Sequence, residues 1–150
     1  MKKIITILFC CVSLNSGAQL NSSIGVGYNS NNYPAYELKC GYELHRINFD
    51  AGFSRSLNRN SNTHIYSGGE IGINLFNEGD AYLLAKSVIV SAGYFYDKVN
   101  SDQKANLSAC RPSISVKYIK LLKENAGLYA KIFYIKNTFE LTGGLFLKFN

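Results

Sequence analysis

The sequence predicts an all-β fold, an eight-stranded antiparallel up-and-down transmembrane β-barrel that follows a cleaved signal peptide. Three observations support this fold class. The chain begins with a short basic and apolar leader, and the rest divides into about eight segments in which residues of two kinds alternate. The less apolar face of these segments is rich in glycine and in charges of both signs. With 150 residues, the chain has room for one domain.

The leader has the three parts of a secretory signal peptide. Lys2 and Lys3 give a basic start, residues 4–14 form an apolar run, and Ser-Gly-Ala at 16–18 offers the small residues that a signal peptidase reads. The apolar run is shorter than the ~20 residues that a membrane-spanning helix needs. We therefore expect a signal peptide over residues 1–18 and a mature barrel domain over residues 19–150.

The four cysteines do not change this interpretation. A lipoprotein signal would have to use Cys10 or Cys11, but Phe9 stands where that signal requires a small residue. Cys40 and Cys110 are predicted on the second and sixth strands, which are not neighbours, and both would face outward. The geometry of a disulfide bond therefore excludes a bond between them.

Composition limits the partners and the way in which a membrane could be crossed. The formal net charge is +6, and removal of Lys2 and Lys3 with the leader leaves a mildly basic chain without any Lys/Arg run. We therefore expect no nucleic-acid partner. The mature part has no long apolar segment, so strands would have to cross the membrane.

The first four segments alternate strictly. Residues 24–28 set Ile, Val and Tyr against two glycines, and residues 35–43 set Tyr, Leu and Cys against Glu, Lys and Gly. Residues 47–54 and 65–75 repeat the pattern, with Phe or Ile on one face and Asn, Asp, Gly or Glu on the other. Each therefore predicts a strand with one apolar face.

The last four segments are less uniform. Residues 88–96 and 110–118 alternate Val, Tyr or Ile with mostly small or charged residues, and residues 139–149 do so up to the C-terminus. Residues 128–136 are apolar on both faces, so we place Lys131 inward and the alternate apolar residues outward. This choice of parity fixes the faces of the seventh strand.

Two places leave alternatives open. Residues 119–126 could form either a helical turn or a connection. Residues 81–96 exceed the roughly 9–11 residues of a tilted spanning strand, and Lys86 shares the outward parity of Val88. Either the strand begins near Ser87 after a longer turn, or a bulge near Lys86 resets the faces.

The connections predict the orientation of the barrel. Those after the odd strands are rich in Asn and Ser (29–33, 57–63 and 97–106), whereas those after the even strands (44–46, 77–80 and 123–125) are not. With the N-terminus in the periplasm, the first set faces outside. An even number of strands then returns the C-terminus to the periplasm, as in single-chain outer-membrane barrels.

The composition of the less apolar face favours a membrane barrel over a soluble one. A narrow interior filled by its own side chains needs glycine for space and charges that neutralise one another. The predicted inward charges, which we call the lumen charge network, are five acids and five bases: Glu37, Glu43, Asp50, Glu70, Glu140, Lys39, Arg111, Lys117, Lys131 and Lys148.

The apolar face is predicted to contact lipid, with aromatic residues near the strand ends as girdles at the two interfaces. The simpler explanation for the aromatics is that Tyr and Phe favour strands in general. The predicted lipid-facing and girdle residues are Tyr28, Tyr36, Tyr42, Phe49, Phe53, Ile71, Ile73, Tyr94, Tyr96, Tyr118, Tyr134, Leu145, Leu147 and Phe149.

The C-terminal stretch 142–150, Thr-Gly-Gly-Leu-Phe-Leu-Lys-Phe-Asn, resembles the final-strand signal of outer-membrane barrels. The mature chain is similar in pattern to the small eight-stranded outer-membrane β-barrel proteins of Gram-negative bacteria. This resemblance implies an outer-membrane location, reached through the inner membrane by way of the signal peptide. It also implies recognition by the barrel-insertion machinery. The chain departs from the signal in one respect, because the aromatic Phe149 is penultimate and Asn150 follows it.

A search for chemistry finds no catalytic or metal constellation. His45 falls in a predicted periplasmic turn, and Ser67 would point to the face opposite His64, so no Ser–His pair is expected. The lipid A deacylase barrels carry His and Ser two residues apart on one strand, where this chain has Tyr66 after His64. Asp97 and Asp102 share a predicted loop without the spacing of a calcium site and are expected to be solvated.

The predicted function is therefore a non-enzymatic structural or interaction role without cofactors. Its expected contacts are outer-membrane lipids, the insertion machinery and a protein partner at the outer loops. The alternatives are an outer-leaflet lipid-modifying enzyme and a soluble periplasmic lipocalin-like barrel that binds an apolar ligand inside.

Overall fold

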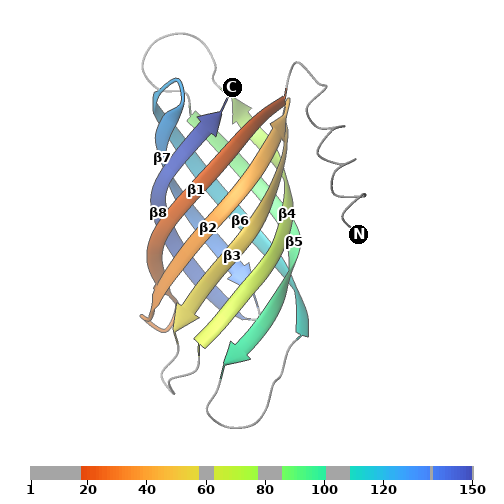
Figure 1. Ribbon diagram of the computed structural model, residues 1–150, viewed down its shortest axis with the longest axis vertical. Helices are drawn as coiled ribbons and strands as arrows, with labels where there is room; N and C mark the ends of the chain where they lie inside the picture. Colours follow the sequence, from red (N-terminus) through yellow and green to blue (C-terminus); the bar gives the residue numbers. More distant parts are fainter. Residues whose placement is uncertain (1–17, 58–62, 78–85, 101–108, 136, 150) are drawn as a thin grey trace.

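A computed structural model describes residues 18–57, 63–77, 86–100, 109–135 and 137–149, which form a closed barrel of eight antiparallel strands (Figure 1). Each strand pairs with the next along the chain, and β1 pairs with β8 to close the sheet. The predicted all-β, eight-stranded up-and-down barrel is thereby confirmed. The strands are β1 (Ala18–Asn29), β2 (Pro34–Leu44), β3 (Ile47–Leu57), β4 (Thr63–Asn77), β5 (Lys86–Asn100), β6 (Ala109–Lys123), β7 (Ala126–Ile135) and β8 (Thr138–Phe149).

The structure distinguishes between the alternatives left open for residues 119–126 and 81–96. β6 continues to Lys123 and a turn at Glu124 and Asn125 leads into β7, so the helical alternative for residues 119–126 is wrong. The reason is that ladder pairing with β7 extends to Lys123 across a bulge after Leu121. In the described part of the chain, no helix is long and apolar enough to cross a membrane.

At the second open segment, β5 begins at Lys86, close to the first alternative, and no bulge resets its faces. A register shift lies instead in the partner strand β4, between Asn74 and Phe76. The predicted turn over residues 77–80 falls mostly outside the described residues, and so does the leader before Ala18.

The two ends of the barrel differ. The start of β1 and the end of β8 lie at the same end, which is the upper end in Figure 1. Two-residue turns join β2 to β3 and β6 to β7 at this end, and His45 adopts a positive φ of 56° in the first of them. At the opposite end, the Asn29 side chain accepts hydrogen bonds from the backbone N–H groups of Asn31 and Tyr33, at 2.9 and 3.1 Å.

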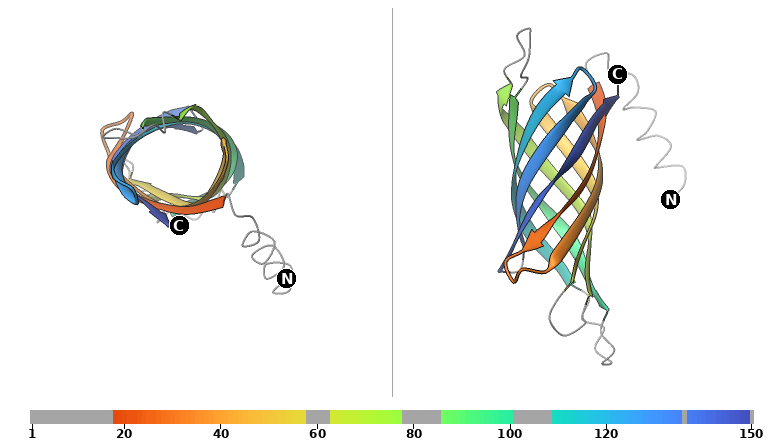
Figure 2. Two further views of the ribbon diagram at one scale, coloured as in Figure 1. Left: turned by 90° about the horizontal axis from the view of Figure 1, so that it is seen from above. Right: turned by 90° about the vertical axis from the view of Figure 1, so that its left-hand side faces the viewer.

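The two faces of the sheet have opposite chemistry. The outside carries exposed Ile, Leu, Val, Tyr and Phe side chains on all eight strands, for example Val26 (62 % exposed), Ile71 (59 %) and Tyr94 (67 %). Among the described residues, the inside contains buried Lys, Glu, Asp, Asn and Ser together with nine buried apolar side chains. Figure 2 shows how the strands enclose this interior. The outside is therefore mainly apolar, and most charges of the described strands face inward, the reverse of a water-soluble protein.

Candidate functional site

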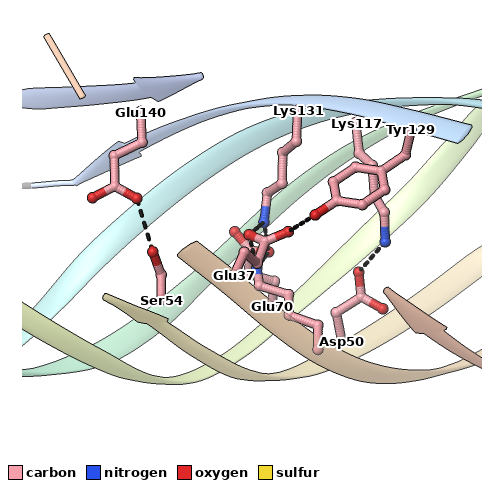
Figure 3. A network of polar contacts seen from close by, with 9 residues as sticks. Glu37, Asp50, Ser54, Glu70, Lys117, Tyr129, Lys131 and Glu140 are labelled. Atoms are coloured by element: carbon pink, nitrogen blue, oxygen red, sulfur yellow. Dashed lines mark hydrogen bonds and ion pairs between the residues drawn. The ribbon is translucent and has the colours of Figure 1, made fainter. Parts of the chain in front are cut away.

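The waist of the barrel contains a compact cluster of four buried charges from β2, β4 and β7. The Lys39 Nζ lies 2.6 Å from a Glu70 oxygen and 3.5 Å from a Glu37 oxygen. The Lys131 Nζ lies 2.8 Å from the same Glu70 oxygen and 3.3 Å from Glu37 (Figure 3). Each of these side chains is at most 2 % exposed, so two ammonium groups and two carboxylates neutralise each other away from bulk water.

Further polar contacts extend this waist cluster along the interior. The Tyr129 hydroxyl donates to Glu37 at 3.1 Å, and the Lys117 Nζ lies 3.2 Å from Asp50 (Figure 3). We call the end opposite the termini the outer end, after the predicted orientation. Farther toward this end, the Ser54 hydroxyl donates to Glu140 at 2.9 Å. These contacts join residues of distant strands, so they tie opposite walls of the barrel together.

Two apolar clusters lie on either side of the waist. Tyr66, Phe95, Phe133 and Ile135 pack together toward the outer end. The second cluster packs toward the end that carries the termini, and consists of Ile89, Ile119, Tyr129 and Phe146 with Leu121 against it.

The lysines of the waist face the rings of these clusters. The Lys39 and Lys131 ammonium groups each lie 5.0 Å from an aromatic ring centre, that of Phe95 and that of Phe133 respectively. Lys117 lies 5.1 Å from the ring centre of Phe146. Cation–π attraction therefore supplements the ion pairs. Apolar, charged and apolar layers follow one another along the interior.

A second polar group lies at the outer mouth. His64 Nδ1 is 3.0 Å from an Asp97 oxygen, and the imidazole stacks on Tyr66 with ring centres 5.9 Å apart. The expectation that Asp97 is a solvated loop charge is wrong, because β5 continues to Asn100 and Asp97 keeps the inward parity of Phe95. Its side chain is only 1 % exposed.

The structure places all ten predicted lumen charges on the inner face, but it does not join them into one network. Glu37, Lys39, Glu70 and Lys131 meet at the waist, and Asp50 pairs with Lys117. Glu43 and Lys148 form a separate, partly exposed pair at 3.3 Å. Glu140 bonds to Ser54, and Arg111 is half-buried near the outer mouth.

Sequence reasoning missed the aromatic layers of the interior and the His64–Asp97 pair. Their signal was present in the alternation, since Tyr66, Phe95 and Phe146 share the parity of the predicted lumen charges. The connections predicted over 57–63 and 97–106 are shorter than expected at their described ends, because Leu57, Thr63 and residues 97–100 belong to strands, and their remaining parts lie outside the described residues.

The predicted lipid-facing residues all belong to the outer face. Tyr42 and Tyr134 are half-buried and the others are exposed. Tyr134 packs on Phe139 with ring centres 4.7 Å apart, and its hydroxyl donates to the Asn137 side chain. Cys40 and Cys110 are exposed and free. Over the described ranges, no three His, Cys, Asp or Glu side chains gather as a metal site would need.

A closed antiparallel barrel with an apolar exterior and a charged, filled interior defines a small transmembrane β-barrel. No protein-family model and no curated protein matches the chain. Its solved structural neighbours share the architecture of small eight-stranded outer-membrane β-barrels.

Three of these neighbours have TM-scores between 0.56 and 0.66. The N-terminal β-barrel domain of Pseudomonas aeruginosa OprF aligns at 0.66 and 14 % identity, over 89 % of this chain and 98 % of that one. Neisserial surface protein A aligns at 0.57 and 14 % identity, over 88 % and 96 %. The outer membrane enzyme PagL aligns at 0.56 and 13 % identity, over 87 % and 99 %. At these identities the likeness shows the fold alone.

Proposed function

We propose that this protein is a non-enzymatic barrel of the outer membrane, closed to ions, which acts as a rigid anchor for its outer end. The observation that carries this proposal is the cluster of four buried charges at the waist, with an apolar layer on each side. Location in the outer membrane is supported by the apolar exterior and by the structural neighbours, whose named members include outer-membrane proteins.

The two apolar layers and the waist cluster between them oppose the passage of ions through the barrel. An ion that crossed the barrel would have to pass the apolar layer in which Phe95 and Phe133 pack with ring centres 5.2 Å apart, and then displace ion pairs of 2.6–3.5 Å. Both steps cost free energy because the pairs are buried and the layers offer few replacement ligands. The filled interior therefore stiffens the barrel and offers no pathway for ions.

The absence of an enzymatic role is part of the proposal. His64 is oriented by the buried carboxylate of Asp97, which is how a general base is often held. Within the described residues, however, His64 contacts Asp97 and Tyr66, and neither supplies a nucleophile for acyl transfer. A structural pair that closes the outer mouth accounts for both contacts. Insertion machinery, outer-membrane lipids and a protein bound at the outer connections remain the proposed partners.

The location is tested by fractionation of the native host or of an expression strain. We expect the protein to sediment with the outer membrane and to migrate as a folded band on SDS gels that shifts when the sample is boiled. Recovery of a soluble periplasmic protein without a heat-modifiable band would contradict the proposal, and would favour a ligand-binding barrel.

Closure to ions is tested in planar lipid bilayers. We expect the purified barrel to insert without stable conductance steps, because the waist cluster and both apolar layers fill the interior. An outer-membrane porin handled in the same detergent serves as the positive control. Reproducible ohmic steps from the folded barrel would refute closure while leaving the membrane location intact.

A further inference from the structure

We propose that Arg55 and Lys98, on the outward face at the outer rim, bind the phosphate of an anionic glycolipid of the outer leaflet. This inference rests on the proposed function only for the location and orientation of the barrel. The observation behind it is that basic side chains lie on the outward face and take no part in the ion pairs of the interior. Both side chains are exposed.

The outward face carries charge of one sign. Among the side chains that the structure describes on the strands, four charged ones lie on this face. Arg55 and Lys98 lie toward the outer end, and Lys120 and Lys123 lie toward the end of the termini. No outward-facing Asp or Glu occurs among the described strand positions. The acids of the described strands face inside, so Arg55 and Lys98 have no acidic neighbour on the outward face of these strands. They therefore suit an anionic headgroup.

The position of the cations matches the depth of the headgroups. Lys120 pairs in register with position 86 of β5, and Lys98 lies farther along the same strand. A strand rises about 3.3 Å per residue, so this stretch of β5 is about 40 Å long. At the usual tilt of about 35–45° it spans about 30 Å along the membrane normal, which is the thickness of the hydrocarbon layer. Arg55 and Lys98 therefore lie at the outer interface.

Register brings the two cations to one place. Arg55 pairs with Ile65, and Ile65 pairs with Lys98, so all three lie in one row across β3, β4 and β5. Directly opposite residues have Cβ atoms about 5 Å apart, so the Cβ atoms of Arg55 and Lys98 are about 10 Å apart. Two such long side chains can converge on one phosphate group, where the guanidinium of Arg55 would bind two oxygens at once.

The rows below the cations suit the rest of such a lipid. Ser67 and Gly69 follow Ile65 on the outward face of β4. Ser67 pairs with Phe53 of β3 and Tyr96 of β5, while Gly69 pairs with Tyr94 of β5. Small residues on the central strand are thus flanked by aromatic ones. Acyl chains of a lipid held at the rim would lie along these apolar rows.

The binding of lipid A tests this site. The probes are lipid A with two phosphates and the same lipid after removal of both phosphates, titrated against the detergent-solubilised folded barrel by native mass spectrometry. We expect the wild type to prefer the phosphorylated form, with an affinity that falls as salt is added. The double variant R55Q/K98Q should bind it about 30-fold more weakly, at about 1 kcal/mol per basic residue near the membrane surface.

The matched control is K120Q/K123Q, which removes the same charge from the opposite rim. It should leave the preference for phosphorylated lipid A unchanged. Equal losses in the two double variants, or equal binding of both lipids by the wild type, would overturn the proposed site. The heat-modifiable band reports folding separately, so loss of that band would point to failure of the barrel and not of the site.

Discussion

Glu70→Gln is expected to lower the free energy of unfolding by about 3–5 kcal/mol, the cost of breaking a buried ion pair from one side. The Glu70 carboxylate lies 2.6 Å from Lys39 and 2.8 Å from Lys131. Without its charge, two buried ammonium groups share the single carboxylate of Glu37. Urea titration of the barrel refolded in lipid vesicles, followed by the shift of the folded gel band, measures the loss.

We expect Glu70→Gln to destabilise the barrel because it leaves the waist cluster with an unbalanced charge, and not because one contact is lost. Lys131→Met should also be strongly destabilising, because two carboxylates then share Lys39. The double variant E70Q/K131M leaves one Lys39–Glu37 pair, 3.5 Å apart, and is neutral. It should therefore lose less than the sum of the single losses. Lys148→Gln is the control, because it breaks the partly exposed pair with Glu43, and it should lower the free energy of unfolding by less than about 1 kcal/mol. If Glu70→Gln also lowered it by less than about 1 kcal/mol, buried charge balance would not be a main source of stability.

Gly144→Ala is expected to destabilise the barrel by about 1–3 kcal/mol through overpacking at the closing seam. Gly144 pairs with Gly25 where β8 meets β1. A Cβ at position 144 would overlap the Ile24 carbonyl oxygen and lie 2.5 Å from the Gly25 Cα. These atoms belong to the backbone, so they can move only if the seam opens. The same urea titration measures the effect.

The adjacent glycine is the matched control. A Cβ at Gly143 points to the opposite face and comes no closer than 3.4 Å to its nearest neighbour, the Tyr129 carbonyl oxygen. Gly143→Ala should therefore change stability by no more than about 0.5 kcal/mol. Equal stability of the two variants would show that the seam adapts, and would remove close strand approach as the reason for glycine at position 144.

Much of the architecture could be predicted because a strand has a side-chain period of two. The alternation of Ile71 and Ile73 with Glu70 and Gly72 is enough to separate two faces, and eight such segments with a polar inner face predict a closed membrane barrel. On β7 both faces are apolar, so alternation alone leaves the parity open, and the inward choice rests on the charge of Lys131, which the structure buries. Local pattern thus determined which face each side chain occupies.

The ends of strands were less predictable than their faces. Asp97 follows Tyr-Phe-Tyr and precedes a polar stretch, so it resembles the start of a loop. It lies instead in β5 because the ladder with β4 continues to Asn100, where Thr63 pairs with it. Pairing with a neighbouring strand supplies hydrogen bonds that the local sequence does not reveal. The His64–Asp97 contact depends on this extension.

The sequence by itself determined the fold class, the number of strands, and which residues face lipid and which face the interior. Only the tertiary structure decided which interior groups meet. Glu37 and Lys131 are 94 residues apart, and Lys39 and Glu70 are 31 apart, yet all four converge at the waist. The physical reason is that strand tilt and stagger set the height of each side chain inside a closed barrel. Alternation gives a direction for each side chain, but height comes only from closure of the whole sheet.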